Sequence, residues 1–212
     1  MRRWWQSWPA LDGNEGKQIR PDAKRRRRWE RSRDNRQTRN VKQGSDILYT
    51  IRPVVRDDEP FLWEMLYYAA HMDEDGEMSP DTAKTNPDLA PYVTNWGRTG
   101  DLGVVAVESE SQPMGAAWLR QMPSNSPLYR FVDTTILELA VAVLPAHINK
   151  GAGTQLLTHL LTAARMVYPA VVLSVRANNP AKQLYERLGF VVVAQMTNRV
   201  GGASFVMKVD LG

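Results

Sequence analysis

The chain has 212 residues, of which 43% are hydrophobic and 24% charged, and these values are typical of one globular domain with a tail. It contains no cysteine, which excludes disulfides, thiolate metal sites and a cysteine nucleophile, and no two of its three histidines lie at metal-ligand spacing. No run approaches the roughly 18 apolar residues of a membrane span, and no apolar core follows the basic N-terminus as it does in a signal peptide. We therefore expect a cytoplasmic protein without a membrane partner. From the cysteine and histidine content we expect no metal.

The charge divides the chain near residue 44. Residues 1–44 hold 14 Lys and Arg against 5 Asp and Glu, whereas the remaining 168 residues hold 13 against 18. The first segment is too polar to bury a core, so we predict a disordered Arg/Trp-rich tail over 1–44 and a folded domain over 45–212. Arginine with interleaved tryptophan suits nucleic acid or an anionic surface, but a solvated extension or a misassigned translation start explains the same composition.

The folded part opens with a strand and a helix. Residues 47–55 alternate between apolar and polar side chains and predict a strand. Asp57 and Asp58 are expected to cap a helix over 59–72, because Pro60 suits the first turn of a helix.

An irregular segment and a hairpin follow. Residues 73–101 are rich in Asp, Pro, Gly and Thr and predict irregular structure with a short helix at 88–96. Two apolar stretches at 102–109 and 113–122, separated by a short polar turn, predict a β-hairpin. Residues 123–128 predict a loop.

A β-α-β unit comes next. Residues 134–144 predict a long strand, and 153–167 a helix whose apolar positions fall on one face. The almost wholly apolar stretch 170–175 predicts a strand covered on both sides. Because a helix connects the two strands, we expect them to be parallel.

The last elements are a helix and two strands. Residues 180–190 predict a helix with Asn179 as its cap, and 191–196 and 203–211 predict strands. The whole order predicts an α/β (α+β) fold with a mixed, mostly antiparallel sheet of about seven strands flanked by helices.

A glycine-bearing loop, INKGAGT, leads into the helix at 153–167. It lacks the Lys-Ser/Thr that follows the second glycine of a Walker A loop, and Leu156 stands at the third glycine of a dinucleotide fingerprint. Gly151 and Gly153 fit a short loop whose backbone N–H groups surround a pyrophosphate at a helix start. A tight turn without any ligand explains the same glycines.

A second motif gives this loop its context. VAVLPAHINKGAGTQLL and LSVRANNPAKQLYERLGFVVV together resemble the two signature motifs of the GNAT superfamily, the acyl-CoA-dependent N-acyltransferases. The first motif is matched at Val143, Pro145, Gly151 and Gly153, but carries Ile148 where the family has Arg or Gln. The second is matched throughout, at Asn178, Ala181, Leu184, Tyr185, Gly189 and Phe190. The resemblance covers about four fifths of the chain and leaves out the tail.

The resemblance implies an N-acetyltransferase in which a primary amine of a small molecule or peptide attacks acetyl-CoA, the co-substrate, directly. It implies that the strand at 134–144 splays from the next strand, so that pantetheine contacts the backbone of Val141, Ala142 and Val143. The pyrophosphate would lie against the loop residues Asn149, Lys150, Gly151, Ala152, Gly153 and Thr154. Asn178 matches a position that contacts CoA in relatives, although local loop bonding is the alternative.

Two residues are candidates for proton transfer. Tyr185 matches the family's usual proton donor to the departing thiolate, and the complete second motif favours this role over the alternative of a core position, which its apolar helical neighbours also fit. Glu138 is the only carboxylate within its strand, where many relatives carry a glutamate that deprotonates the amine; a solvent-facing glutamate is the alternative. Asp133 is a weaker candidate. Ser174 stands where some protein N-terminal acetyltransferases carry Glu, which argues against that subclass.

The acceptor site is predicted only in outline. The first helix and the loop after it contain a group of aromatic and acidic residues, with one histidine: Tyr67, Tyr68, His71, Asp73, Glu74 and Asp75. An acidic rim around the acceptor site would favour a cationic amine. An ordinary solvated loop after a core helix explains the same composition. Trp118 and Arg120 can face either the core or the acceptor cleft. Other readings stay open: a CoA-binding regulatory domain without turnover, a homodimer, and a nucleic-acid partner reached only through 1–44.

Overall fold

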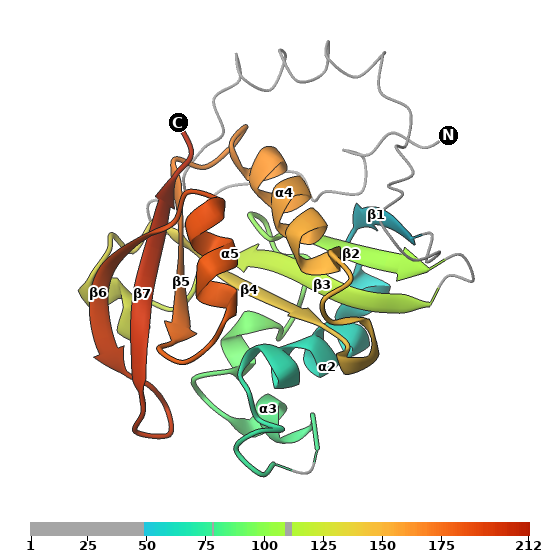
Figure 1. The fold of residues 1–212 in the computed structure, drawn as a ribbon, viewed down its shortest axis with the longest axis horizontal. Helices are drawn as coiled ribbons and strands as arrows, with labels where there is room; N and C mark the ends of the chain where they lie inside the picture. The colour runs from blue at the N-terminus through green and yellow to red at the C-terminus, as the bar shows by residue number, and fades with distance from the viewer. Residues whose placement is uncertain (1–48, 78, 109–111) are drawn as a thin grey trace.

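The computed structural model describes residues 49–77, 79–108 and 112–212, and the predicted tail over 1–44 lies outside these ranges. Seven strands form one sheet in the order β1-β2-β3-β4-β5-β7-β6 (Figure 1). Neighbouring strands are antiparallel except β4 and β5, which are parallel. The mixed, mostly antiparallel sheet and the parallel pair across the β-α-β unit are therefore confirmed.

The first half of the sheet is a meander in which the predicted hairpin joins β2 to β3. Its strands are β1 (Tyr49–Pro53), β2 (Leu102–Glu108), β3 (Pro113–Arg120) and β4 (Leu137–Val143). The second half contains β5 (Ala170–Arg176), β6 (Val191–Thr197) and β7 (Ala203–Asp210). The main helices are α2 (Glu59–Ala69), α4 (Ala152–Ala164) and α5 (Ala181–Arg187).

Helices cover both faces of the first half, because side chains alternate along each strand. On β3, Ala117 and Leu119 pack in the cluster that contains α4, whereas Trp118 packs on the opposite face in the cluster that contains α2. Figure 1 shows α4 crossing in front of the sheet and α2 behind it. The predicted apolar face of α4 is confirmed as buried, at Leu156, Leu157, Leu160, Leu161 and Ala164.

The start of α2 differs from the prediction. Asp58 stands at the N-cap, but its carboxylate makes no capping hydrogen bond to the helix. It instead accepts hydrogen bonds from the Arg52 guanidinium, at 2.7 and 2.8 Å, and from the Val55 N–H at 2.8 Å. A guanidinium offers a stronger, charged partner than the exposed N–H groups of a first turn, so the side chain turns away. The helix ends at Ala69 rather than at residue 72, and His71 follows with a φ of +56°.

The segment 73–101 contains two short helical turns, α3 (Thr82–Thr85) and the 3₁₀ turn η3 (Ala90–Tyr92). Two buried β3 side chains hold the η3 region against the sheet. The Trp118 indole N–H donates to the Tyr92 carbonyl at 3.0 Å. The Arg120 guanidinium donates to the carbonyls of residues 94 and 95 and pairs with Asp101 at 3.2 Å. Trp118 and Arg120 therefore face the core and serve to position this loop.

Candidate active site

A fork in the sheet creates the site. β4 and β5 pair at only two positions, Leu137 with Val171 and Glu138 with Val172. Beyond Glu138, β4 continues to Val143 with β3 as its neighbour on one side. In the described residues, the β4 edge that faces β5 is therefore open from residue 139 onward, and its backbone groups are available to an extended ligand. The expected splay is present, with Glu138 at the point of the fork.

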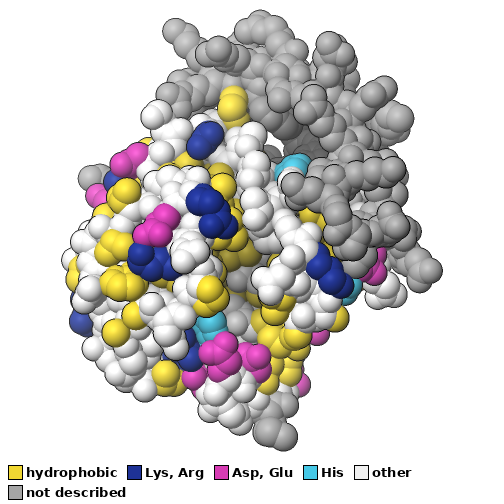
Figure 2. All heavy atoms as spheres, viewed as in Figure 1, with side chains coloured by type: hydrophobic (Ala, Val, Ile, Leu, Met, Phe, Trp, Pro, Cys, Tyr) yellow, Lys and Arg dark blue, Asp and Glu magenta, His cyan; other side chains and the backbone are white. Residues whose placement is uncertain are grey.

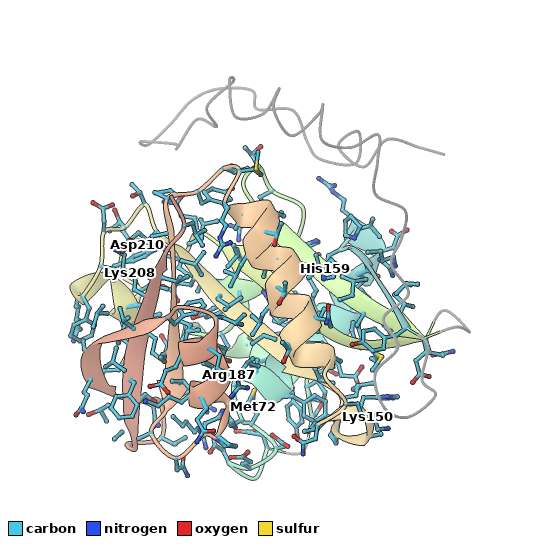
Figure 3. The ribbon with its side chains drawn as sticks, turned by 45° about the horizontal axis from the view of Figure 1, so that its top comes forward. Met72, Lys150, His159, Arg187, Lys208 and Asp210 are labelled. Atoms are coloured by element: carbon cyan, nitrogen blue, oxygen red, sulfur yellow. The ribbon has the colours of Figure 1, made fainter. Side chains whose placement is uncertain are left out.

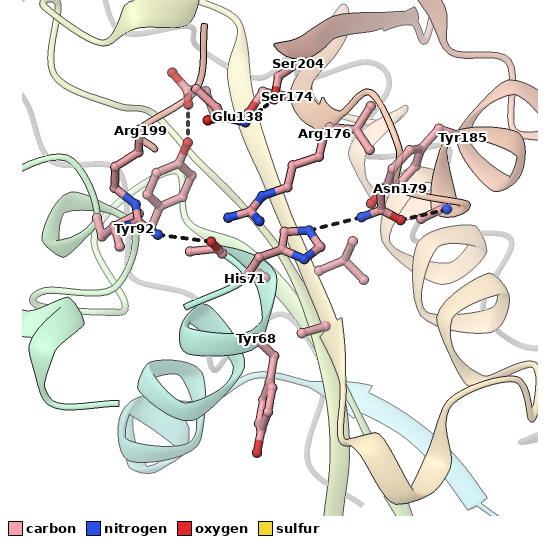
Figure 4. A pocket seen from close by; sticks show the side chains of 18 of the residues that line it. Tyr68, His71, Tyr92, Glu138, Ser174, Arg176, Asn179, Tyr185, Arg199 and Ser204 are labelled. Carbon is pink, nitrogen blue, oxygen red and sulfur yellow. Dashed lines mark hydrogen bonds between the residues drawn. The ribbon is translucent and has the colours of Figure 1, made fainter. Parts of the chain in front are cut away.

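A cleft of about 1580 Å³ fills this fork and extends to both ends of it. Its lining includes Val141, Ala142 and Val143 of the open edge, and also Glu138, Tyr185 and Asn178. Figure 4 shows Glu138 and Tyr185 on opposite sides of the view, with the Arg176 side chain between them. The structure thus brings both predicted proton-transfer residues and the predicted pantetheine segment into one cavity.

The glycine loop forms one end of the cleft. Asn149 and Gly151 adopt φ angles of +63° and +81°, which turn the chain sharply into α4. Among the described residues, no acceptor is bound to the backbone N–H groups of 149–154, as expected for a loop that opens a helix. Asn149, Gly151, Gly153 and Thr154 line the cleft, whereas Lys150 and Ala152 do not. Lys150 is exposed beside the start of α4, and His159 lies on the outer side of the same helix (Figure 3).

Tyr185 lies on α5 at the wall of the cleft. The side chain is 8% exposed, and its ring makes an edge contact with Phe190 at 5.8 Å between centroids. Burial raises the pKa of the Tyr185 phenol to about 12. Within the described part of the chain its hydroxyl has no hydrogen-bond partner, so the proton is available to a group bound in the cleft. Tyr185 is therefore both a core residue and a cleft residue.

Glu138 is fully buried, so the alternative of a solvent-facing glutamate is excluded. Its Oε2 accepts a hydrogen bond from the Tyr92 hydroxyl at 2.5 Å, and its Oε1 accepts one from the Ser126 hydroxyl. Burial raises the pKa of Glu138, and these two hydrogen bonds oppose that rise because they stabilise the carboxylate. The arrangement is that of a buried carboxyl group with a raised pKa.

A polar network crosses the mouth of the cleft. The Asp75 carboxylate, from the loop after α2, accepts hydrogen bonds from Arg176 at 2.6 and 2.8 Å and from Arg199 at 2.8 Å. Arg176 ends β5, and Arg199 lies between β6 and β7. Hydrogen bonding from Arg176 lowers the pKa of Asp75, and the charge of Arg199 lowers it further. We call Asp75, Arg176 and Arg199 the mouth cluster.

His71 extends this network to α5. The N-cap of α5 is Pro180 rather than the predicted Asn179, but the Asn179 carboxamide oxygen accepts the N–H of Ala181, the first residue of the helix, at 2.8 Å. The carboxamide nitrogen of Asn179 donates a hydrogen bond to His71 Nε2 at 3.0 Å (Figure 4). The other ring nitrogen of His71 lies 3.0 Å from Glu74 and therefore carries the proton.

The expected acidic rim is thus largely neutralised. Asp75 is paired with two arginines, and Glu74 lies 3.5 Å from Arg176. Figure 2 shows acidic side chains beside basic and histidine side chains near the lower centre of this face. The composition of the loop alone does not define the charge of the acceptor.

Four residues of this site were missed by the sequence reasoning: Tyr92, Ser126, Arg176 and Arg199. Each lies at the end of an element or in a loop, where no periodicity marks a functional side chain. Within the described ranges, no group of acidic or histidine side chains is arranged to hold a metal ion, and no helix combines the length and hydropathy of a membrane crossing.

Known proteins share the sequence pattern and the fold of this chain. Residues 57–190 match the family model described as the acetyltransferase (GNAT) family. A protein from Salmonella typhimurium proposed to be an acetyltransferase, solved with its cofactor acetyl-CoA, is 26% identical with a TM-score of 0.57, and 79% of this chain and 95% of that chain are covered. No curated protein matches the chain in a sequence search.

Two further solved structures share the fold. One, proposed to be an acetyltransferase from Acinetobacter baylyi, is 18% identical with a TM-score of 0.60 over 79% of this chain and 94% of that chain. The other is a spermidine N-acetyltransferase chimera from Vibrio cholerae, 20% identical with a TM-score of 0.55 over 77% of this chain and 95% of that chain.

Proposed function

This chain belongs to the acetyltransferase (GNAT) family, whose members are acyltransferase enzymes, and on that premise we propose that it transfers the acetyl group of acetyl-CoA to a primary amine of a small molecule or peptide. One observation carries the proposal. A single cleft joins an open strand edge, a loop whose N–H groups bind no acceptor within the described ranges, a buried carboxylate and a buried phenol. These are the four elements that direct acyl transfer to an amine requires.

The residues present fit acetyl-CoA at two places. The free N–H groups of 149–154, together with the positive end of α4, suit a pyrophosphate. The open edge at Val141, Ala142 and Val143 suits the amides of pantetheine, and one of its N–H groups would polarise a thioester carbonyl. Acetyl-CoA, when bound, supplies the acetyl thioester. Asn178 would add a side-chain contact from the opposite wall.

Glu138 and Tyr185 divide the proton transfers. The raised pKa of Glu138 suits a base that accepts a proton from the incoming ammonium group. Because the pKa of Tyr185 is about 12, its hydroxyl keeps its proton at neutral pH and can donate it where a thiolate departs. Asp133 is not needed in this scheme. The second amine proton would restore the Tyr185 hydroxyl, so that the site returns to its starting state.

A thiol-release assay tests this function. The full chain is incubated with acetyl-CoA and, separately, with spermidine, L-lysine, glycylglycine and 2-phenylethylamine, and free CoA and acetylated amine are measured by a thiol reagent and by mass spectrometry. We expect amine-dependent CoA release that is lost in Glu138→Gln and kept in His159→Gln, the matched control on the outer side of α4. Binding of acetyl-CoA without turnover of any amine would instead identify a regulatory CoA-binding domain.

Two features of the molecule in the cell remain predictions. A solved spermidine N-acetyltransferase from Vibrio cholerae is dodecameric, and we propose that this chain also associates with copies of itself, which light scattering would measure directly. We also propose a cytoplasmic location.

A further inference from the structure

The proposed base lies in the wall of the cleft with a hydroxyl group bound to each of its oxygens. Glu138 has no solvent-exposed surface. An amine in the cleft therefore meets a carboxylate whose two oxygens are both occupied. A proton can reach Glu138 through either of the two hydroxyl groups that touch it.

Ser126 is one of the two hydroxyl residues that bind this carboxylate, and like Tyr92 it lines the cleft. The residue is half-buried, lines the cleft, and donates its hydroxyl hydrogen to Glu138 Oε1. Its backbone is held in place, because its N–H donates to the Pro123 carbonyl at 2.9 Å and its carbonyl accepts the Tyr129 N–H at 3.1 Å.

The loop around Ser126 is rigidly closed. The Tyr129 hydroxyl accepts the Met122 N–H and donates to the Ile136 carbonyl, both at 3.1 Å, so it ties the two ends of the loop together. Leu128, next to it, is buried under the sheet in a cluster with Ile136. The serine is thus fixed over the carboxylate rather than carried on a free loop.

We propose that Ser126 is a catalytic residue that relays a proton from the acceptor amine to Glu138. The inference rests on the proposed acetyl transfer and adds a residue to it. The Ser126 oxygen accepts an N–H proton of the acceptor ammonium while the Ser126 hydroxyl proton moves to Glu138 Oε1. The N–H and O–H bonds that break are replaced by an O–H bond on Ser126 and one on Glu138. The amine becomes neutral, Glu138 becomes a carboxylic acid, and that proton later returns to solvent.

Tyr92 is the competing route. It also lines the cleft, and its hydroxyl donates to the other carboxylate oxygen at 2.5 Å. It lies on η3, which Trp118 holds in place. We assign Tyr92 the positioning of the carboxylate, and Tyr92→Phe serves as the matched control, since it removes one hydrogen bond to Glu138 and keeps the serine.

The test compares Ser126→Ala, Ser126→Thr and Tyr92→Phe. Turnover is measured with the most active amine of the four-member panel, acetyl-CoA affinity by calorimetry, and the Glu138 titration by carbon-13 NMR of its carboxyl group. We expect Ser126→Ala to lower kcat by about 100-fold with unchanged acetyl-CoA affinity. The Glu138 pKa should rise in this variant, because a hydrogen bond to the carboxylate is lost. Ser126→Thr keeps the hydroxyl and should restore kcat to within a few-fold.

Three results would overturn the relay. They are a Ser126→Ala enzyme with kcat close to that of the wild type, a Ser126→Thr enzyme as inactive as Ser126→Ala, or a larger loss in Tyr92→Phe than in Ser126→Ala. If the first result comes with a raised Glu138 pKa, the serine has a positioning role only. Absence of both acetyl-CoA binding and turnover in the wild type would reject the acetyl transfer itself, so the two failures are distinguishable.

Discussion

Asp75→Asn is expected to destabilise the domain by about 3 kcal/mol, because it removes the carboxylate that pairs with both arginines of the mouth cluster and leaves Arg176 only Glu74 among the described residues, at 3.5 Å. The Asp75 carboxylate makes three hydrogen bonds of 2.6 to 2.8 Å to Arg176 and Arg199. Its side chain is 12% exposed, and those of the arginines are 19% and 26% exposed. Breaking a buried pair is worth about 3–5 kcal/mol, and the partial exposure of the guanidinium groups favours the lower end of that range.

Thermal unfolding measures this effect. For a domain of this size, 1 kcal/mol corresponds to about 2–4 °C, so Asp75→Asn should lower Tm by about 6–12 °C at pH 7. Asp81→Asn is the control, since its exposed pair with Lys84 should change Tm by no more than a few degrees.

The difference in Tm should also depend on pH. The pKa of Asp75 is lower in the folded protein than its ordinary value of 3.8, so its stabilising effect is complete above pH 3.8 and is lost as the pH falls through the folded pKa. The two Tm curves should therefore converge in strong acid. A neutral-pH Tm within about 2 °C of the wild type would contradict this prediction, because the mouth cluster would then contribute as little as a surface ion pair.

Three further predictions concern the chemistry of the cleft. Tyr185→Phe should lower kcat by about 100-fold or more with unchanged acetyl-CoA affinity in calorimetry, and equal turnover would remove Tyr185 from the mechanism. Ile148→Arg, at a 53% exposed position beside the glycine loop, should tighten acetyl-CoA binding several-fold at low salt and less at high salt; unchanged affinity would show that the backbone N–H groups suffice. The pH profile of kcat/KM should fall on the acid side around a pKa above 4.5, the ordinary value for Glu138, and a profile flat down to pH 4 would exclude Glu138 as the base.

The features that could be predicted from the sequence are those with a local pattern. The apolar face of α4 follows from helical spacing, and the parallel pairing of β4 and β5 follows from the helix that connects them. The left-handed backbone at Gly151 is one that glycine favours. The place of Tyr185 in the cleft follows from the second motif, and that of Glu138 from its position in the strand. In each case the residues that decide the structure lie within a few positions of one another.

The features that could not be predicted depend on contacts between distant residues. Ser126 and Tyr92 lie 12 and 46 positions from Glu138, in segments without periodicity. The acidic loop after α2 was visible in the sequence, but the arginines that neutralise Asp75 lie 101 and 124 positions away. The burial of Glu138 likewise required the three-dimensional fold, because the alternation of one strand cannot show what covers it.

Calorimetric titration of the full chain with acetyl-CoA measures whether the cleft binds this co-substrate. We expect saturable binding of one acetyl-CoA per chain, and much weaker binding of S-acetylpantetheine, which lacks the pyrophosphate that the N–H groups of 149–154 would hold. Binding should also raise Tm as the acetyl-CoA concentration increases. The absence of saturable heat at millimolar acetyl-CoA, with no change in Tm, would contradict the assignment of the cleft.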